Sequence, residues 1–135
     1  MTIQTILLVE DNFVNQMLAV TLLEKLGAKV KKAENGSEAL DAVRQDHFDL
    51  IFMDIQMPDM DGLAATRLIR KLNNDASTTP IIAMTANSLA EHREDCFAAG
   101  MDDYLAKPIN LDDLRRAISD WEGRRSGKAI SKAVA

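Results

Sequence analysis

Carboxylates, a hydroxyl and an amine follow short apolar runs at four places in the sequence. "LLV" precedes Glu10 and Asp11, "LIFM" precedes Asp54, "IIAM" precedes Thr85, and "YLA" precedes Lys107. Uninterrupted apolar runs of this length are typical of parallel strands that are covered on both faces. If these strands are parallel, their carboxyl ends lie at one edge of the sheet, where ligands bind in such folds. The five polar side chains are therefore expected to lie together.

Such a cluster requires positive charge. Three carboxylates held about 4 Å apart would repel each other by roughly 4 kcal/mol per pair at an effective dielectric near 20. Lys107 supplies one charge, and a hard cation with oxygen ligands would supply the rest. A few carboxylates with room for water and phosphate oxygens suit Mg²⁺ better than an enclosed Ca²⁺ site.

The chemistry indicated is phosphoryl transfer. A metal, the amine of Lys107 and the hydroxyl of Thr85 around one carboxylate would stabilise a transferring phosphoryl group. Asp54 is the carboxylate best placed to receive it as a nucleophile. Taken singly, each of these residues is better explained as a solvated loop residue or a cap. Five at the matching ends of four strands favour a site.

The elements that would position these residues alternate between strand and helix. Strands are predicted over residues 5–9, 29–33, 50–53, 81–85 and 104–107. Helices are predicted from about residue 14 to 26, around 39–43, and over 63–72, 88–99 and 111–121, with glycine at position 27 and asparagine at position 110 as caps. Val14, Met17, Leu18 and Leu22 recur at helical spacing in the first of them. The alternation predicts an α/β fold, a three-layer sandwich with helices on both faces of a parallel sheet.

Length and composition limit the class of protein. The chain has 135 residues, which suits one domain, and 47% hydrophobic with 27% charged residues is a globular composition. The N-terminus has no signal-peptide pattern and the apolar runs are only strand length, so no membrane segment and a cytoplasmic location are expected. Cys96 is the one cysteine, which excludes an internal disulfide and predicts a packing role.

Charge is distributed unevenly along the chain. The net charge is -5, with 12 basic and 20 acidic residues in 1–121, and 4 basic and 1 acidic residue in 122–135. An acidic body repels nucleic acid, so the domain itself is not expected to bind it. We predict a domain over residues 1–121 and a basic tail over 122–135 that is a linker or a remnant of cloning.

The motifs "VEDN", "MDIQMPDMDG", "MTAN" and "AGMDDYLAKPI" resemble the receiver domain of bacterial response regulators. The resemblance is strongest to the receivers of hybrid sensor kinases and multistep phosphorelays, and it covers about residues 4–121 with all motifs in order. It implies a flavodoxin-like sheet of five parallel strands in the order 2-1-3-4-5. It also implies that Asp54 is the phosphoacceptor.

The resemblance assigns roles to further residues. Asp11 matches the direct Mg²⁺ ligand, Glu10 matches an acidic neighbour that acts through water, and the backbone carbonyl of Gln56 completes the protein ligands with Asp54. Lys107 matches the residue that pairs with the phosphoryl oxygens.

Other matching residues belong to the conformational response. Thr85 matches a switch hydroxyl and Tyr104 a switch aromatic residue, and the Lys107–Pro108 peptide is expected to be cis. The switch alters the face formed by the fourth helix, the fifth strand and the fifth helix.

The implied partner is a histidine kinase or a histidine phosphotransfer protein whose phosphohistidine is the donor. The chain would be a monomer or a weak, phosphorylation-dependent dimer. It would be a signalling module, not an enzyme with a separate substrate, although it assists its own phosphorylation and dephosphorylation. The parent chain could be a hybrid histidine kinase.

Two alternatives are weaker. A phosphatase of the haloacid dehalogenase type needs a second aspartate two residues after the nucleophile, and that position is Gln56. A degenerate receiver that serves only as an interaction module usually loses the acids or the lysine, which are all present here.

Several polar residues near the motifs are assigned minor roles. Capping or solvation is expected for Asp59 and Asp61, loop positions for Asp102 and Asp103, and surface positions for His47 and His92. Gln56 and Asn87 are hypothesised to set the lifetime of the phosphoryl group.

Overall fold

The computed structural model describes residues 4–57, 60–86 and 90–125. The elements in chain order are β1 (Thr5–Val9), α1 (Phe13–Lys25), β2 (Lys29–Ala33), α2 (Gly36–Gln45), β3 (Leu50–Asp54), α3 (Gly62–Arg70), the 3-10 helix η1 (Asp75–Thr78), β4 (Ile81–Thr85), α4 (Ala90–Ala99), β5 (Asp103–Ala106) and α5 (Leu111–Arg125). All strand pairs are parallel, and the order in the sheet is β2-β1-β3-β4-β5. The predicted α/β fold and strand order are confirmed.

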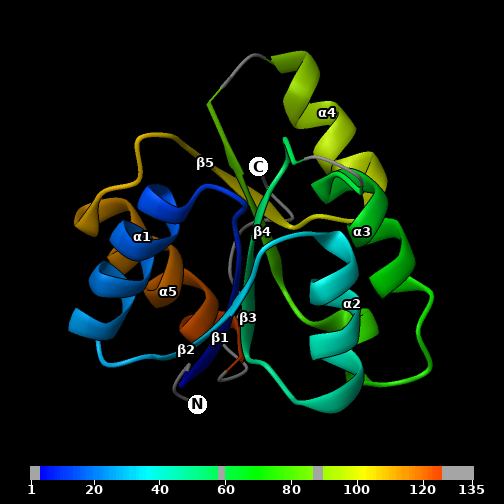
Figure 1. The fold of residues 1–135 in the computed structure, drawn as a ribbon, viewed down its shortest axis with the longest axis horizontal. Helices are drawn as coiled ribbons and strands as arrows, with labels where there is room; N and C mark the ends of the chain where they lie inside the picture. Colours follow the sequence, from blue (N-terminus) through cyan, green and yellow to red (C-terminus); the bar gives the residue numbers. More distant parts are fainter. Residues whose placement is uncertain (1–3, 58–59, 87–89, 126–135) are drawn as a thin grey trace.

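Helices cover both faces of the sheet (Figure 1). Helices α1 and α5 lie on one face, and α2, α3 and α4 lie on the other. Residues of one strand alternate between two apolar cores: Ile6 and Leu8 face α1 and α5, and Leu7 and Val9 face the opposite side. All four side chains have no exposed surface. Double coverage is why the strands read as continuous apolar runs.

Short polar side chains fix where the helices begin. The side chains of Asn12, Asn35, Asp61 and Asn110 each accept a hydrogen bond from the backbone N–H three residues later. Each such cap contributes about 1 kcal/mol. The predicted caps are confirmed at Asn110 and at Gly27, which has a φ of 92° that favours glycine.

The strand ends differ by one residue from the prediction. Strand β3 includes Asp54, because Asp54 still pairs in register with Met84 of β4. Strand β5 runs from Asp103 to Ala106 instead of over 104–107. The Lys107 N–H still donates to the Thr85 carbonyl at 2.7 Å, but Pro108 follows and has no N–H to extend the pairing.

Three helical features also differ from the prediction. The 3-10 helix η1 lies between the predicted helix 63–72 and the predicted strand 81–85, where no element was predicted, and α5 continues to Arg125, beyond the predicted end at residue 121. The predicted start of α4 at Ser88 lies outside the described residues. In α1, the residues whose spacing predicted the helix do not all face the core: Val14, Met17 and Leu18 are exposed. Within the described residues, no helix has the length and apolar character needed to cross a membrane.

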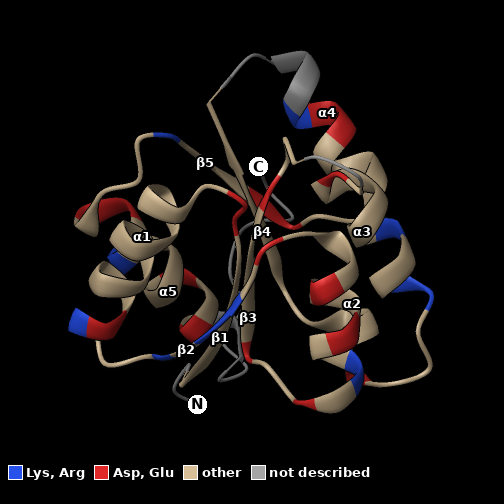
Figure 2. Cartoon of the chain, viewed as in Figure 1, with Lys and Arg blue, Asp and Glu red and all other residues tan. Residues whose placement is uncertain are grey.

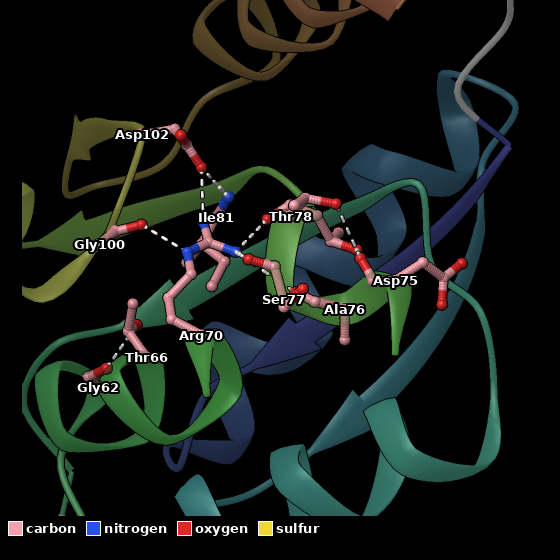
Figure 3. A network of polar contacts seen from close by, with 11 residues as sticks. Gly62, Thr66, Arg70, Asp75, Ala76, Ser77, Thr78, Ile81, Gly100 and Asp102 are labelled. Carbon is pink, nitrogen blue, oxygen red and sulfur yellow. Dashed lines mark hydrogen bonds and ion pairs between the residues drawn. The ribbon is translucent and has the colours of Figure 1, made fainter. Parts of the chain in front are cut away.

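One arginine joins α3 to the segments that precede β4 and β5, as Figure 3 shows. Arg70 donates from Nε to the Gly100 carbonyl at 2.8 Å and from Nη1 to the Thr79 carbonyl at 2.7 Å, and its Nη2 pairs with Asp102 at 2.7 Å. Asp102 also accepts from the Ile81 N–H at 2.9 Å. Asp102 lies in the loop before β5, as predicted, and it also anchors α3 to β4. The loop position predicted for Asp103 is wrong, because Asp103 is the first residue of β5.

Candidate functional site

Three carboxylates meet at the carboxyl ends of β1 and β3. Val9 and Met53 are register partners, so Glu10 and Asp11 follow β1 at the level where Asp54 ends β3. One side-chain oxygen from each of the three residues lies within 4.8 Å of the others. Glu10 and Asp54 are only 2% and 3% exposed, whereas Asp11 is exposed to solvent. The site therefore has two buried carboxylates and one carboxylate that is open to solvent.

Lys107 contacts both buried carboxylates. Its Nζ lies 2.9 Å from Glu10 Oε1 and 3.1 Å from Asp54 Oδ2. The residue reaches the site from the end of β5, two strands away from β3 in the sheet. One ammonium group thus pairs with two carboxylates that are themselves neighbours, which leaves the three-acid cluster with excess negative charge.

The pKa values reflect this imbalance. The pKa of Asp54 is raised from 3.8 to about 6; burial is the largest cause and the charge of Glu10 adds to it, while Lys107 opposes the shift. Burial alone would lower the pKa of Lys107, but the hydrogen bond to Glu10 and the charges of Asp54 and Glu10 outweigh it and raise that pKa. Lys107 is therefore charged at neutral pH, and Asp54 would be held ionised more firmly by an additional cation.

Backbone donors and a glycine hold the carboxylates in place. The Asn12 N–H donates to Glu10 Oε2 and the Gln56 N–H donates to Asp54 Oδ1, both at 3.1 Å. Gln16 of α1 donates from Nε2 to the Glu10 carbonyl at 3.0 Å. A Cβ on Gly62, the first residue of α3, would overlap the Asp54 carbonyl oxygen. Sequence reasoning missed Gln16 and Gly62; the one detectable indication was a polar Gln16 on the otherwise apolar inner side of α1.

Thr85 and Tyr104 lie on the two strands beyond β3. Thr85 is buried and ends β4, one residue beyond Met84, the register partner of Asp54. Tyr104 is half-buried on β5 and packs against the core on the α2, α3 and α4 face. The Lys107–Pro108 peptide is cis. The structure thus brings Thr85 and Lys107 to the same edge as the acids, and places Tyr104 nearer the start of β5.

The other polar residues singled out in the sequence lie away from the acid cluster or cannot be placed. Asp61 caps α3, as predicted. His47 is exposed and contacts Asp75 at 2.6 Å and Asp49 at 3.3 Å, near the start of β3. Cys96 is buried in the core, as predicted. Asp59, Asn87 and the side chain of His92 lie outside the described residues.

The donor set suits a small hard cation. It consists of carboxylate oxygens, which Mg²⁺ prefers, and Asp11 keeps one side of the cluster open for water or a phosphate oxygen. A phosphoryl oxygen placed beside Asp54 would also lie within reach of the Lys107 ammonium. The arrangement can therefore neutralise charge on a phosphoryl group while a carboxylate attacks it.

Comparison with known proteins gives consistent results. The family model of the response regulator receiver domain matches residues 6–119. The sensor protein GacS of Pseudomonas syringae pv. syringae is 44% identical over 120 residues, which cover 87% of this chain and 13% of GacS. The signal transduction histidine-protein kinase BarA of Escherichia coli K12 is 42% identical over 130 residues, which cover 96% of this chain and 14% of BarA. The chain thus spans only about a seventh of these relatives.

Solved structures agree with the fold. The receiver domain of sensor histidine kinase PA1611 from Pseudomonas aeruginosa PAO1, which has a magnesium ion in its active-site cleft, is 45% identical with a TM-score of 0.82; the match covers 89% of this chain and 98% of that one. The receiver domain of Ssk1 from Saccharomyces cerevisiae was crystallised with the histidine phosphotransfer protein Ypd1. That structure matches with a TM-score of 0.85 at 31% identity, over 92% of both chains.

Proposed function

This chain belongs to the response regulator receiver family, and from that premise we propose that Asp54 is its phosphoacceptor. It is a receiver domain of a two-component or phosphorelay system, and its donor is the phosphohistidine of a histidine kinase or a histidine phosphotransfer protein. The observation that supports Asp54 is its position: it ends the central strand β3, between the acids that follow β1 and Thr85 at the end of β4, and it contacts Lys107. Asp11 is exposed, and Glu10 follows β1, which is not a neighbour of the strand that carries Thr85.

In the transfer, an Asp54 Oδ atom attacks phosphorus, the O–P bond forms, and the N–P bond to the donor histidine breaks. The electron pair of that bond stays on the histidine nitrogen. The Gln56 N–H donates to Oδ1 and Lys107 contacts Oδ2, so the carboxylate is oriented before the donor arrives. As charge develops on the phosphoryl oxygens, Lys107 can move from the carboxylates to pair with them.

Glu10, Asp11 and Asp54 would hold Mg²⁺, together with the backbone carbonyl of Gln56. Bound there, Mg²⁺ supplies positive charge to the phosphoryl oxygens and keeps Asp54 ionised. Glu10 would act through water, as the family resemblance implies. The chain's own residues provide an acidic, oxygen-only pocket and the orienting hydrogen bonds.

Thr85 and Tyr104 are proposed to convert phosphorylation into a change of surface. Thr85 ends the strand next to Asp54, so its hydroxyl can shift to a phosphoryl oxygen. Tyr104 lies on the adjoining strand and is only half-buried, so an inward movement of its ring would bury it further. Such a switch works because one group makes different contacts in two states of the domain.

We propose a signalling phosphoacceptor that assists its own phosphorylation and dephosphorylation and has no separate substrate. The phosphatase alternative lacks its general acid, because Gln56 occupies that position. The interaction-only alternative is disfavoured by the intact cluster of acids with Lys107. Residues 1–121 are proposed as the functional unit, and the chain can be one part of a hybrid kinase like the relatives it matches.

The test is intact mass after incubation with Mg²⁺ and acetyl phosphate. We expect one phosphoryl adduct that requires Mg²⁺, disappears in EDTA, is cleaved by hydroxylamine and is absent in Asp54→Asn. The matched control is Asp61→Asn, which changes a nearby acid that caps α3 and lies outside the cluster. The adduct should persist in the control. A wild-type chain without adduct after rapid quenching would contradict the proposal and favour the interaction-only alternative.

A further inference from the structure

The buried side of helix α1 includes one polar residue. Of its three buried residues, Gln16, Ala19 and Leu23, only Gln16 carries an amide. The residue is only 6% exposed. Burying an amide costs free energy unless it forms hydrogen bonds, whereas an apolar residue at this position would have no such requirement. Gln16 forms its hydrogen bond with the backbone of the acid cluster, because its Nε2 donates to the Glu10 carbonyl at 3.0 Å.

The Glu10 carbonyl lies where the pairing of two strands ends. The Glu10 N–H donates to the Ala33 carbonyl at 3.0 Å, one residue beyond the last register pair of β1 and β2. Strand β2 ends at Ala33, and Asn35 already caps α2. The pairing therefore does not extend to the Glu10 carbonyl, and the amide of Gln16 supplies the donor instead. Gln16 thus fixes the peptide group between Glu10 and Asp11 from the side of α1.

This peptide group determines the position of Asp11. The side chain of Glu10 is held separately, by the Asn12 N–H and by Lys107. Asp11 is exposed, and none of the hydrogen bonds described at this edge reaches its carboxylate. The direction of the Asp11 side chain therefore depends on its backbone, which continues directly from the peptide group that Gln16 holds.

Gln16 contributes a hydrogen bond without contributing charge. No residue from Asn12 to Leu23 is charged, and Figure 2 accordingly shows most of α1 in tan. A lysine or arginine in place of Gln16 would also offer donors to a carbonyl, but its positive charge would repel a cation bound to the acids. An amide therefore leaves the negative charge of the acid cluster unchanged for Mg²⁺.

From these contacts we propose that Gln16 is a positioning residue of the Mg²⁺ site. It holds the Glu10 carbonyl, and through the Glu10–Asp11 peptide it keeps the Asp11 carboxylate near those of Glu10 and Asp54 before the cation binds. Gln16 acts through these residues and is not itself a ligand. The inference rests on the proposed function, because the cation is the one that serves phosphoryl transfer at Asp54. Removing a hydrogen bond that orients a metal ligand typically lowers metal affinity by roughly 10–100-fold.

The experiment uses two variants of Gln16 and one matched control. Gln16→Met keeps the length of the side chain and removes the donor, and Gln16→Asn keeps the amide but is too short to reach the Glu10 carbonyl. The control is Thr79→Val, which also removes a buried hydrogen bond from a side chain to a carbonyl. Thr79 is likewise 6% exposed, and its Oγ1 donates to the Asp75 carbonyl at 3.2 Å. It precedes β4, whereas the acids lie at the level of the opposite end of that strand.

We expect all three variants to unfold at lower urea concentrations than the wild-type chain, because each loses one buried hydrogen bond. Only the two Gln16 variants should bind Mg²⁺ more weakly, by roughly tenfold, in calorimetric titration. The Mg²⁺ concentration that gives half-maximal labelling by acetyl phosphate should rise by the same factor, while the labelling rate at saturating Mg²⁺ stays close to that of the wild-type chain. A purely structural role would lower stability without this selective change in Mg²⁺ affinity.

Mg²⁺ affinity equal to that of the wild-type chain in either folded Gln16 variant would overturn the proposal. So would an equal loss of affinity in Thr79→Val, because affinity would then follow overall stability. If Gln16→Met does not fold, Gln16→Asn decides by the same criterion. A wild-type chain that binds Mg²⁺ but is not labelled by acetyl phosphate would contradict the proposed function, and the affinities would still decide the role of Gln16. A wild-type chain that binds no Mg²⁺ would overturn both.

Discussion

The chemistry of this domain depends on one ammonium group between two buried carboxylates. Lys107 contacts Glu10 and Asp54 at 2.9 and 3.1 Å, and Asp11 adds a third negative charge at the solvent-facing side. Without a cation, the native state holds more negative charge at this edge than Lys107 can neutralise. The excess negative charge that suits phosphoryl transfer therefore reduces the stability of the metal-free fold. Removing a carboxylate should raise the free energy of unfolding, and removing the ammonium group should lower it.

Asp54→Asn should stabilise the metal-free protein. The folded pKa of Asp54 is about 6, above the ordinary 3.8, so between about pH 4 and 6 the native state binds more protons than the unfolded state. Stability from this group is therefore present at low pH and is lost as the pH rises through 6. In EDTA at pH 7.5 we expect the variant to gain roughly 1–3 kcal/mol in urea unfolding, and little at pH 4.

The control for this effect is Asp61→Asn, because asparagine caps a helix as well as aspartate does. It should leave the free energy of unfolding within about 0.5 kcal/mol. A loss of stability for Asp54→Asn at pH 7.5, or a gain independent of pH, would contradict the claim that the metal-free site carries more negative charge than Lys107 neutralises.

Lys107→Met should act in the opposite direction. It leaves two adjacent buried carboxylates without a counter-charge, so we expect a loss of roughly 2–4 kcal/mol in EDTA at pH 7.5, partly restored by Mg²⁺. Lys31→Met is the comparison, because Lys31 pairs with Asp46 at 2.8 Å on an exposed surface and should cost less than about 1 kcal/mol. Equal losses of unfolding free energy in the two variants would show that the buried carboxylates do not need Lys107 as a counter-charge.

At the scale of elements, close packing between α3 and the end of β3 fixes the acceptor. Gly62 begins α3 and its N–H donates to the Ile55 carbonyl at 3.0 Å, directly behind Asp54. The added Cβ of alanine would overlap the Asp54 carbonyl, which is backbone and cannot move alone. The position of the carboxylate is therefore coupled to the start of the helix.

Gly62→Ala should cost roughly 2–3 kcal/mol in unfolding and weaken Mg²⁺ binding, since the clash shifts the Asp54 backbone. Gly27→Ala serves as the control. It has a φ of 92° but nothing within 4 Å of the added Cβ, so it should cost about 1 kcal/mol and leave Mg²⁺ binding unchanged. The measurement is urea unfolding together with calorimetric titration of Mg²⁺. Unaltered Mg²⁺ affinity in Gly62→Ala would rule out this coupling.

Arg70→Met should destabilise the fold without affecting the site. The variant removes the ion pair with Asp102 and the hydrogen bonds to the carbonyls of Thr79 and Gly100, all of which are partly buried. We expect a loss of roughly 3 kcal/mol in unfolding, because Asp102 would remain without its charged partner. Labelling of folded protein by acetyl phosphate should be unchanged. A comparable loss of labelling would mean that the two ends of the sheet are coupled.

Sequence predicted the elements better than it predicted their orientation. Continuous apolar runs located the central strands β1, β3 and β4 because both faces of the sheet are covered there, and strand ends located Asp54 and Lys107. The pattern in α1 predicted a helix but not which side is buried, because apolar residues lie on both sides. The network of Arg70 depends on segments far apart in the chain, so no local pattern could indicate it.

At the scale of the whole molecule, two apolar cores lie on opposite faces of one sheet. The core beneath α1 and α5 contains Ile6, Leu8, Phe52 and, as its last member along the chain, Trp121. No described residue after Trp121 belongs to either core. We propose the domain limit at residue 121 from this packing as well as from the charge pattern.

This limit leads to a prediction about truncation. A chain ending at Arg125 keeps all of α5 and both cores, so it should unfold at the same urea midpoint as the complete chain and be labelled by acetyl phosphate at the same rate. Trp121→Ala in the complete chain should lose roughly 3–5 kcal/mol, because Trp121 is only 7% exposed. The Trp121 variant tests whether packing at the end of α5 stabilises the fold. The truncation tests whether the basic tail contributes to stability. A truncated chain that is as unstable as the Trp121 variant would place the domain limit beyond Arg125 and would make the tail part of the folded unit.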